Sequence, residues 1–67
     1  MMLNVNNLRA EFARNRKTQK DVAKILGISE KTLISRMRDG DFRLTEVEVL
    51  IRELHIEDPM CVFFNNS

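Results

Sequence analysis

The 67-residue sequence has few of the residues that cross-link or interrupt small proteins. It contains one cysteine, one proline, two glycines, and neither tryptophan nor tyrosine. A single cysteine, Cys61, excludes an internal disulfide and a cysteine-rich metal site. His55 is the only histidine, and no paired carboxylates stand out beside it, so no group of residues indicates catalysis. We therefore expect a protein that is not an enzyme and that needs no cofactor and no metal.

Long apolar segments are missing as well. No run approaches the roughly 18–20 apolar residues that span a bilayer, and no signal-peptide pattern opens the chain. With 43% hydrophobic and 31% charged residues, the composition is that of a globular protein rather than a disordered one. We expect one domain over residues 1–67, in the cytoplasm and without a membrane partner.

The charge is unevenly distributed although the net charge is only +1. Residues 1–40 hold nine Lys and Arg against four acids, a net charge of +5, whereas residues 41–67 hold two against six, a net charge of −4. Such a polarised molecule can direct its basic half toward a polyanion. The other interpretation is that these charges only solvate helix surfaces.

The apolar residues recur at helical spacing along the whole chain, without strand-like alternation. Helices are predicted after Asn4 to about Arg14, with Val5, Leu8, Phe12 and Ala13 on one face, after Thr18 to Leu26, and after Ser29 to about Arg38. A fourth helix is predicted from a Thr45–Glu48 capping box with a Leu44–Val49 staple, and a short last one from Asp58-Pro59 through Phe63. The expected fold is all-α, a compact bundle of four to five short helices.

The segment from Gln19 to Arg38 has the residues that two steeply crossing helices need around a short turn. Ala23 is small where the helices approach, and Gly27 can adopt the left-handed conformation that ends the first of them. Ile28 is apolar and is expected to point inward, while Leu33 fixes the second helix against the first. The sequence thus predicts a helix-turn-helix over about residues 18–38.

The stretch T-Q-K-D-V-A-K-I-L-G-I-S-E-K-T-L, Thr18 to Leu33, followed by Gly40 and a fourth amphipathic helix, resembles the phage-repressor and Cro-like helix-turn-helix family, often called the XRE family. The resemblance covers roughly residues 5–57 and implies a lambda-repressor-like fold. It also implies a transcriptional regulator that binds double-stranded operator DNA, usually as a homodimer on a palindromic site. The expected function is that of a Cro-like repressor of phage or prophage type, in a bacterium or a phage-infected host cell.

This chain departs from the family pattern at Arg36, where members commonly have an apolar residue. The apolar residue of this chain is Met37, one position later. Two rotations of the second helix follow. If Leu33, Ile34 and Met37 point inward, the outer face carries Lys31, Thr32 and Ser35, with Arg36 and Arg38 at its edges. If the family's rotation holds, the residues facing the bases are Glu30, Lys31, Ile34 and Ser35.

The predicted DNA contacts fall into three groups. Base contacts are expected from Glu30, Lys31, Ile34 and Ser35, of which Lys31 and Ser35 face outward in both rotations. Base or phosphate contacts are expected from Ser29, Thr32 and Arg36. Phosphate contacts are expected from Arg16, Lys17, Thr18, Gln19, Lys20, Arg38 and Arg43, with Gln19 at the position where the resemblance places a backbone-gripping glutamine.

The C-terminal segment is more apolar than a free tail. Either Phe63 and Phe64 fold back onto the core, or Met60, Val62, Phe63 and Phe64 form a dimer surface. A helical protein-interaction module, of anti-repressor or antitoxin type and without operator binding, is the alternative to a DNA-binding regulator.

Overall fold

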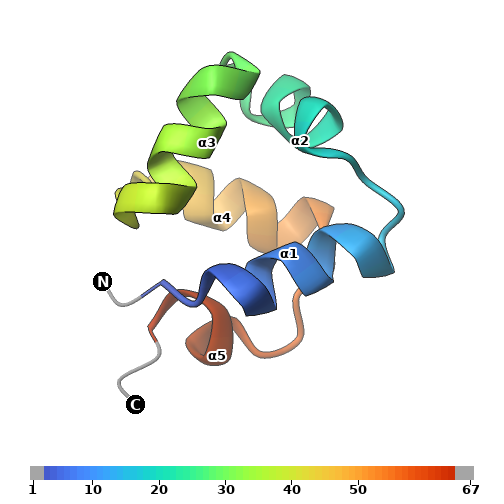
Figure 1. The fold of residues 1–67 in the computed structure, drawn as a ribbon. Helices are drawn as coiled ribbons and strands as arrows, with labels where there is room; N and C mark the ends of the chain where they lie inside the picture. Colours follow the sequence, from blue (N-terminus) through green and yellow to red (C-terminus); the bar gives the residue numbers. More distant parts are fainter. Residues whose placement is uncertain (1–2, 65–67) are drawn as a thin grey trace.

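Five helices make up the fold in the computed structural model, which describes residues 3–64. They are α1 (Val5–Arg14), α2 (Gln19–Leu26), α3 (Glu30–Asp39), α4 (Leu44–Glu53) and α5 (Pro59–Phe63), and the described part of the chain contains no strand. Figure 1 shows α2 and α3 meeting at one corner, with α1 running across below them and α4 behind. The predicted all-α bundle of short helices is confirmed.

Most of the helices begin where the sequence predicts, because a side chain caps each start. Asn4 Oδ1 accepts a hydrogen bond from the Asn7 N–H (2.9 Å) at α1, and Ser29 Oγ accepts one from the Thr32 N–H (3.0 Å) at α3. At α5 the Asp58 carboxylate accepts from the Cys61 N–H (3.4 Å), ahead of Pro59 in the first turn. Each cap satisfies a backbone donor that the helix itself leaves free.

The predicted start of α4 is wrong by two residues. The helix begins at Leu44, and Glu46 accepts a hydrogen bond from the backbone N–H of Arg43 (2.9 Å). Thr45 is exposed within the first turn instead of capping it, and Leu44 is exposed too, so no staple to Val49 forms. Glu46, which is buried, thus takes the role that the sequence assigned to Glu48.

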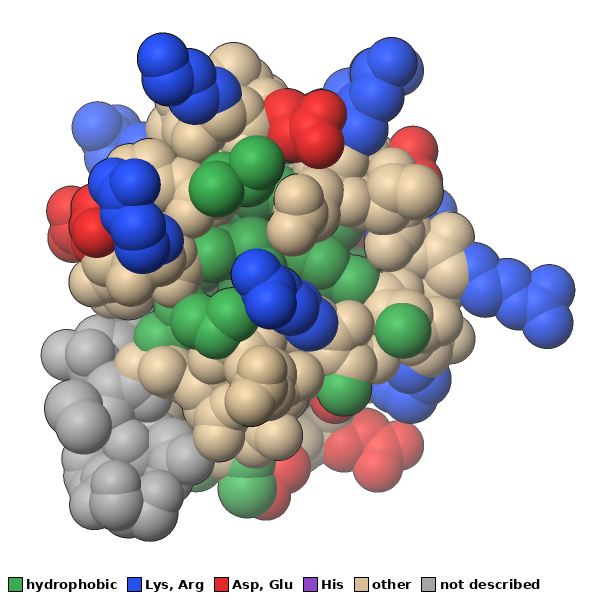
Figure 2. Space-filling view, viewed as in Figure 1, with side chains coloured by type: hydrophobic (Ala, Val, Ile, Leu, Met, Phe, Trp, Pro, Cys, Tyr) green, Lys and Arg blue, Asp and Glu red, His purple; other side chains and the backbone are tan. Residues whose placement is uncertain are grey.

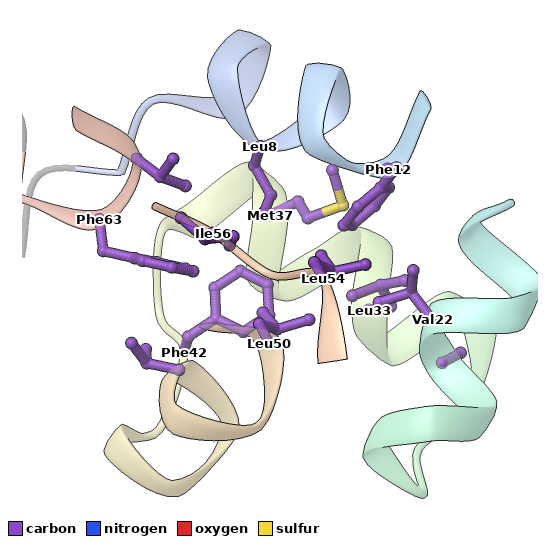
Figure 3. Close-up of a cluster of buried hydrophobic side chains, with 13 residues drawn as sticks. Leu8, Phe12, Val22, Leu33, Met37, Phe42, Leu50, Leu54, Ile56 and Phe63 are labelled. Carbon is purple, nitrogen blue, oxygen red and sulfur yellow. The ribbon is translucent and has the colours of Figure 1, made fainter. Parts of the chain in front are cut away.

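The core draws side chains from all five helices (Figure 3). Phe42, in the loop before α4, packs edge to face on Phe63 of α5, with ring centroids 6.4 Å apart. On α1 the prediction needs one correction: Ala13 is exposed, and Val5 is only half-buried. The core residues are Leu8, Phe12, Val22, Ala23, Leu33, Met37, Phe42, Val47, Leu50, Leu54, Ile56, Val62 and Phe63.

The C-terminal segment divides between the core and the surface. Val62 and Phe63 are buried, so the prediction that they belong to a dimer surface is wrong; folding back onto the core removes them from contact with a second copy. Met60 and Phe64 remain exposed, at 61% and 39%. The Asn4 N–H donates to Val62 O (2.8 Å), which fixes α5 against the start of α1.

The far end of α1 is joined to the end of α4. Arg14 Nη2 donates to the carbonyl oxygens of Leu54 (2.8 Å) and His55 (2.9 Å), and Asn15 Nδ2 also donates to Leu54 O (2.8 Å). These bonds satisfy carbonyls that the end of α4 leaves unpaired.

Between residues 3 and 64, no helix combines the length and the apolar character that crossing a membrane requires.

Candidate nucleic-acid interface

Residues 27–29 connect α2 to α3 in a tight turn. Gly27 has φ +72°, in the left-handed region, and its N–H donates to Lys24 O (3.1 Å), while the Ile28 N–H donates to Ala23 O (3.0 Å). An alanine at position 27 would meet no atom within 4 Å, so the need for glycine comes from φ alone. Ile28 packs against the core as predicted, and Ala23 is buried.

The burial along α3 decides between the two rotations that the sequence leaves open. Leu33 and Met37 are buried, the latter with 2% exposure, whereas Ile34 is 46% exposed. The rotation with Ile34 pointing inward is therefore wrong. Glu30 and Lys31 are exposed beside Ile34, and Ser35 is half-buried.

Arg36 points toward α4 rather than to solvent. Its Nε lies 3.2 Å from Glu46 Oε2, and the two side chains are only 18% and 10% exposed. The pair is close but not aligned as a hydrogen bond, since Nε has no hydrogen-bond partner within the described residues. Arg36 Nη1 donates to Asp41 O (3.3 Å). The guanidinium thus connects α3, the following loop and the start of α4.

The start of α2 has a complete capping box. The Asp21 N–H donates to Thr18 Oγ1 (3.1 Å), and the Thr18 N–H donates to Asp21 Oδ2 (2.9 Å). The hydrogen bonds from Thr18 hold the pKa of Asp21 below its ordinary value. The helical ladder starts at the Val22 N–H, so the N–H groups of Gln19 and Lys20 have no partner inside the helix.

Seven exposed cations have no ion pair within residues 3–64, where the acids pair only with Arg14, Arg36, Arg38 and Arg52. Six of the seven come from α1, α2, α3 and the loop between α1 and α2. In Figure 2, blue Lys and Arg side chains lie along the upper part and the sides of this face and in its middle, with green apolar side chains between them and some red Asp and Glu side chains among them. The unpaired cations are Arg9, Arg16, Lys17, Lys20, Lys24, Lys31 and Arg43.

Two surface hollows flank α3. The first, of about 320 Å³, is lined by Lys31, Thr32, Ser35, Arg36, Asp39 and Asp41. The second, of about 290 Å³, is lined by Val5, Arg9, Gln19, Ile34, Met37 and Arg38. The helix α3 is thus a ridge between two depressions, and α1 and α2 contribute to only one of them.

The ridge and its flanks bring together most of the residues predicted to contact bases. Lys31, Thr32 and Ser35 lie on one flank, and Ile34 lies on the other with Gln19 and Arg38. Glu30 and Ser29 stand at the start of α3, where Ser29 is engaged in the cap. The remaining predicted phosphate contacts line neither hollow: Arg16, Lys17, Thr18, Lys20 and Arg43.

Arg9 is the residue that sequence reasoning missed. It lies on α1, outside the predicted helix-turn-helix, and lines the second hollow one turn after Val5. Its i, i+4 spacing from Val5 places both on one helix face, which is the signal the sequence offered.

No group of three potential metal ligands comes together among residues 3–64. The Cys61 thiol donates to Asp58 Oδ2 (3.0 Å), and this bond raises the pKa of the thiol, which disfavours the nucleophilic thiolate.

Comparison of the chain with models of protein families, with characterised proteins and with solved structures gave no match.

Proposed function

We propose that this protein is a sequence-specific regulator of transcription that binds double-stranded DNA with α3 in the major groove. The observation that carries the proposal is the exposed ridge of α3, beside the start of α2 and among unpaired cations. A helix of this kind fits the width of the major groove, where each base pair has a distinct pattern of donors and acceptors.

Base readout is assigned to three exposed side chains of α3, Glu30, Lys31 and Ile34, and to the half-buried Ser35. Lys31 can donate to O6 and N7 of guanine, and Ser35 can donate or accept. Ile34, exposed although its neighbours Leu33 and Met37 are buried, can contact a thymine methyl group. Glu30 can accept from N4 of cytosine.

Phosphate binding is assigned to the start of α2 and to the cations around it. The free N–H groups of Gln19 and Lys20 point where the positive end of the helix dipole favours an anion. Thr18, Arg16 and Lys17 lie beside them, and Arg38 and Arg43 lie at the end of α3 and the start of α4. Arg36, held by Glu46, is given a positioning role in place of a DNA contact.

We propose further that two copies bind a palindromic site, as a Cro-like repressor in a bacterium or a phage-infected cell would. The support is the resemblance of Thr18–Leu33 to that family, together with the few phosphates that a single small domain can contact. Of the predicted dimer residues, Met60 and Phe64 are the exposed ones.

The salt dependence of binding tests the DNA interaction itself. Affinity for a labelled 20-base-pair duplex is measured by fluorescence anisotropy at several salt concentrations between 50 and 200 mM. If each protein neutralises four phosphates, log K falls against log salt with a slope of about −3.6. A flat dependence, or no binding, contradicts the proposal and favours the protein-interaction module.

Selecting bound duplexes from a random pool then supplies the preferred site, and two variants separate base readout from phosphate binding. Lys31→Ala should lower affinity for the selected site by about tenfold more than for random duplex, because Lys31 reads a base. Gln19→Ala should weaken both by a similar factor of about five, because a phosphate contact carries no sequence information. Arg52→Ala, which removes an exposed cation of α4 that lines neither hollow, is the control. Equal losses on both duplexes for Lys31→Ala would show that Lys31 does not read bases.

A further inference from the structure

The hollow between α1, α2 and α3 has an apolar floor and a polar rim. Val5 of α1 and Ile34 and Met37 of α3 provide the apolar surface, with Met37 buried beneath and Ile34 half open to solvent. Arg9, Gln19 and Arg38 come from three different helices and complete the lining. Figure 2 shows green apolar side chains in the middle of the face that α1, α2 and α3 form.

The charge at the rim is of one sign. None of the six lining residues is acidic, and Arg9 forms no ion pair within residues 3–64. Arg38 pairs with Asp39 through Nε (3.2 Å), and its two terminal nitrogens donate to no other group within residues 3–64. A hollow lined by apolar side chains and by two arginines suits a ligand that combines an apolar part with anionic groups.

We propose that the hollow holds one sugar-phosphate strand of DNA, with a deoxyribose against Val5 and its two flanking phosphates on Arg9 and Arg38. The inference rests on the proposed function and adds α1 to the DNA-binding surface. A strand is the occupant because the hollow adjoins both the exposed ridge of α3 and the start of α2. The free N–H groups of Gln19 and Lys20 can therefore take a phosphate further along the same strand.

The first test is the variant Arg9→Ala, measured against the same 20-base-pair duplexes. Losing one phosphate contact should make the salt slope shallower by about 0.9 and lower the affinity about eightfold at 0.1 M salt. The preference for selected over random duplex should not change, because the contact carries no base information. Arg9 is exposed, and an unchanged circular dichroism spectrum and melting temperature show that the fold is retained.

The second test locates the contact on the DNA. Single phosphates of the selected duplex are replaced, one at a time, by neutral methylphosphonates. Among the positions at which wild type loses affinity, two neighbouring ones should belong to this hollow: Arg9→Ala should be insensitive at one of them and Arg38→Ala at the other. Arg52→Ala should respond as wild type does.

The outcomes distinguish the inference from the function on which it rests. If wild type binds no duplex, both are overturned. If wild type binds with the expected salt slope but Arg9→Ala leaves affinity and slope unchanged, only the inference is overturned. Saturable binding of thymidine 5′-phosphate that is lost in Arg9→Ala, with duplex affinity unaffected, would instead identify the hollow as a site for a free nucleotide.

Discussion

The side chain of Arg36 leaves α3 toward the first turn of α4 and meets a carboxylate that is already in use. Glu46 accepts from the Arg43 N–H through Oε1 and pairs with Arg36 through Oε2. The buried carboxylate of Glu46 therefore caps the start of α4 and also holds Arg36 on the side of α3 that faces away from solvent. Any change at either residue acts on both helices.

A double-mutant cycle measures this coupling. Arg36→Met should destabilise the protein by about 1–3 kcal/mol, because it leaves the Glu46 carboxylate buried without a counter-charge. Glu46→Gln keeps an oxygen for the Arg43 N–H and should cost less than Glu46→Ala. The double variant Arg36→Met/Glu46→Gln should be more stable than the sum of the single effects implies. Urea unfolding followed by circular dichroism provides the free energies; additive effects would mean that the two side chains do not interact.

The same pair explains why the orientation of α3 could not be predicted from the sequence. Periodicity alone places Ile34 and Met37 equally well beside Leu33, and an arginine in place of an apolar residue suggests an outward position. Arg36 turns inward because Glu46, ten residues away and on another helix, is there to meet it. Such a tertiary contact leaves no local pattern.

At the scale of the helix, the capping box of α2 makes its stability depend on pH. Because hydrogen bonds from Thr18 depress the pKa of Asp21 in the folded protein, its carboxylate contributes stability above the unfolded pKa of about 3.9. That contribution is lost as the pH falls below this value and through the lower folded pKa.

The free energies of unfolding of wild type and Asp21→Asn should accordingly differ at pH 6 and converge toward pH 2.5. Urea unfolding at both pH values measures the difference, and a carboxyl titration by NMR gives the midpoint for Asp21. A midpoint at or above 3.9, or a difference that stays constant with pH, would contradict the depressed pKa.

Helix starts show what the sequence can and cannot predict at this scale. The caps of α1, α2, α3 and α5 follow from residues within three positions of one another, and all four predictions are confirmed. At α4 the sequence offers two glutamates, each three residues after a possible start. Glu48 lies three residues after Thr45, which is a good capping residue. The helix nevertheless begins at Leu44, and Glu46, whose carboxylate pairs with Arg36, accepts the hydrogen bond from the Arg43 N–H.

For the molecule as a whole, α5 completes the core, and Phe63 in this helix and Phe64 directly after it should respond differently to truncation. Phe63→Ala should destabilise by about 3–5 kcal/mol, since it removes a fully buried ring that packs on Phe42. A domain of this size has a total stability of roughly 3–10 kcal/mol, so much of it would be lost. Phe64→Ala should change stability by only about 0.5 kcal/mol, because the ring is partly exposed. Thermal unfolding of both variants tests this, and equal melting temperatures would contradict it.

The fold class and four of the five helix starts were therefore predictable. Which surface residues come to lie together was less predictable. Patterns of apolar residues predict which face of a helix is buried, and they place Leu33 and Leu50 in the core correctly. They could not assign Arg9 to the hollow beside α3, because that hollow forms only when α1, α2 and α3 meet. The DNA contacts remain predictions that the binding experiments will test.

The hydrogen bond from the Asn4 N–H to Val62 O closes the chain into a ring. The chain runs from α1 through α2, α3 and α4 to α5, which packs back on the start of α1. The order in which the helices are connected can therefore be changed while every pair of packed helices stays in contact. A circular permutant with the old ends linked and new ends opened in the loop between α1 and α2 keeps every helix intact. In the order of the chain α2 and α3 lie between α1 and α5, so fraying that begins at either end of the described chain reaches α1 or α5 before it reaches the ridge of α3.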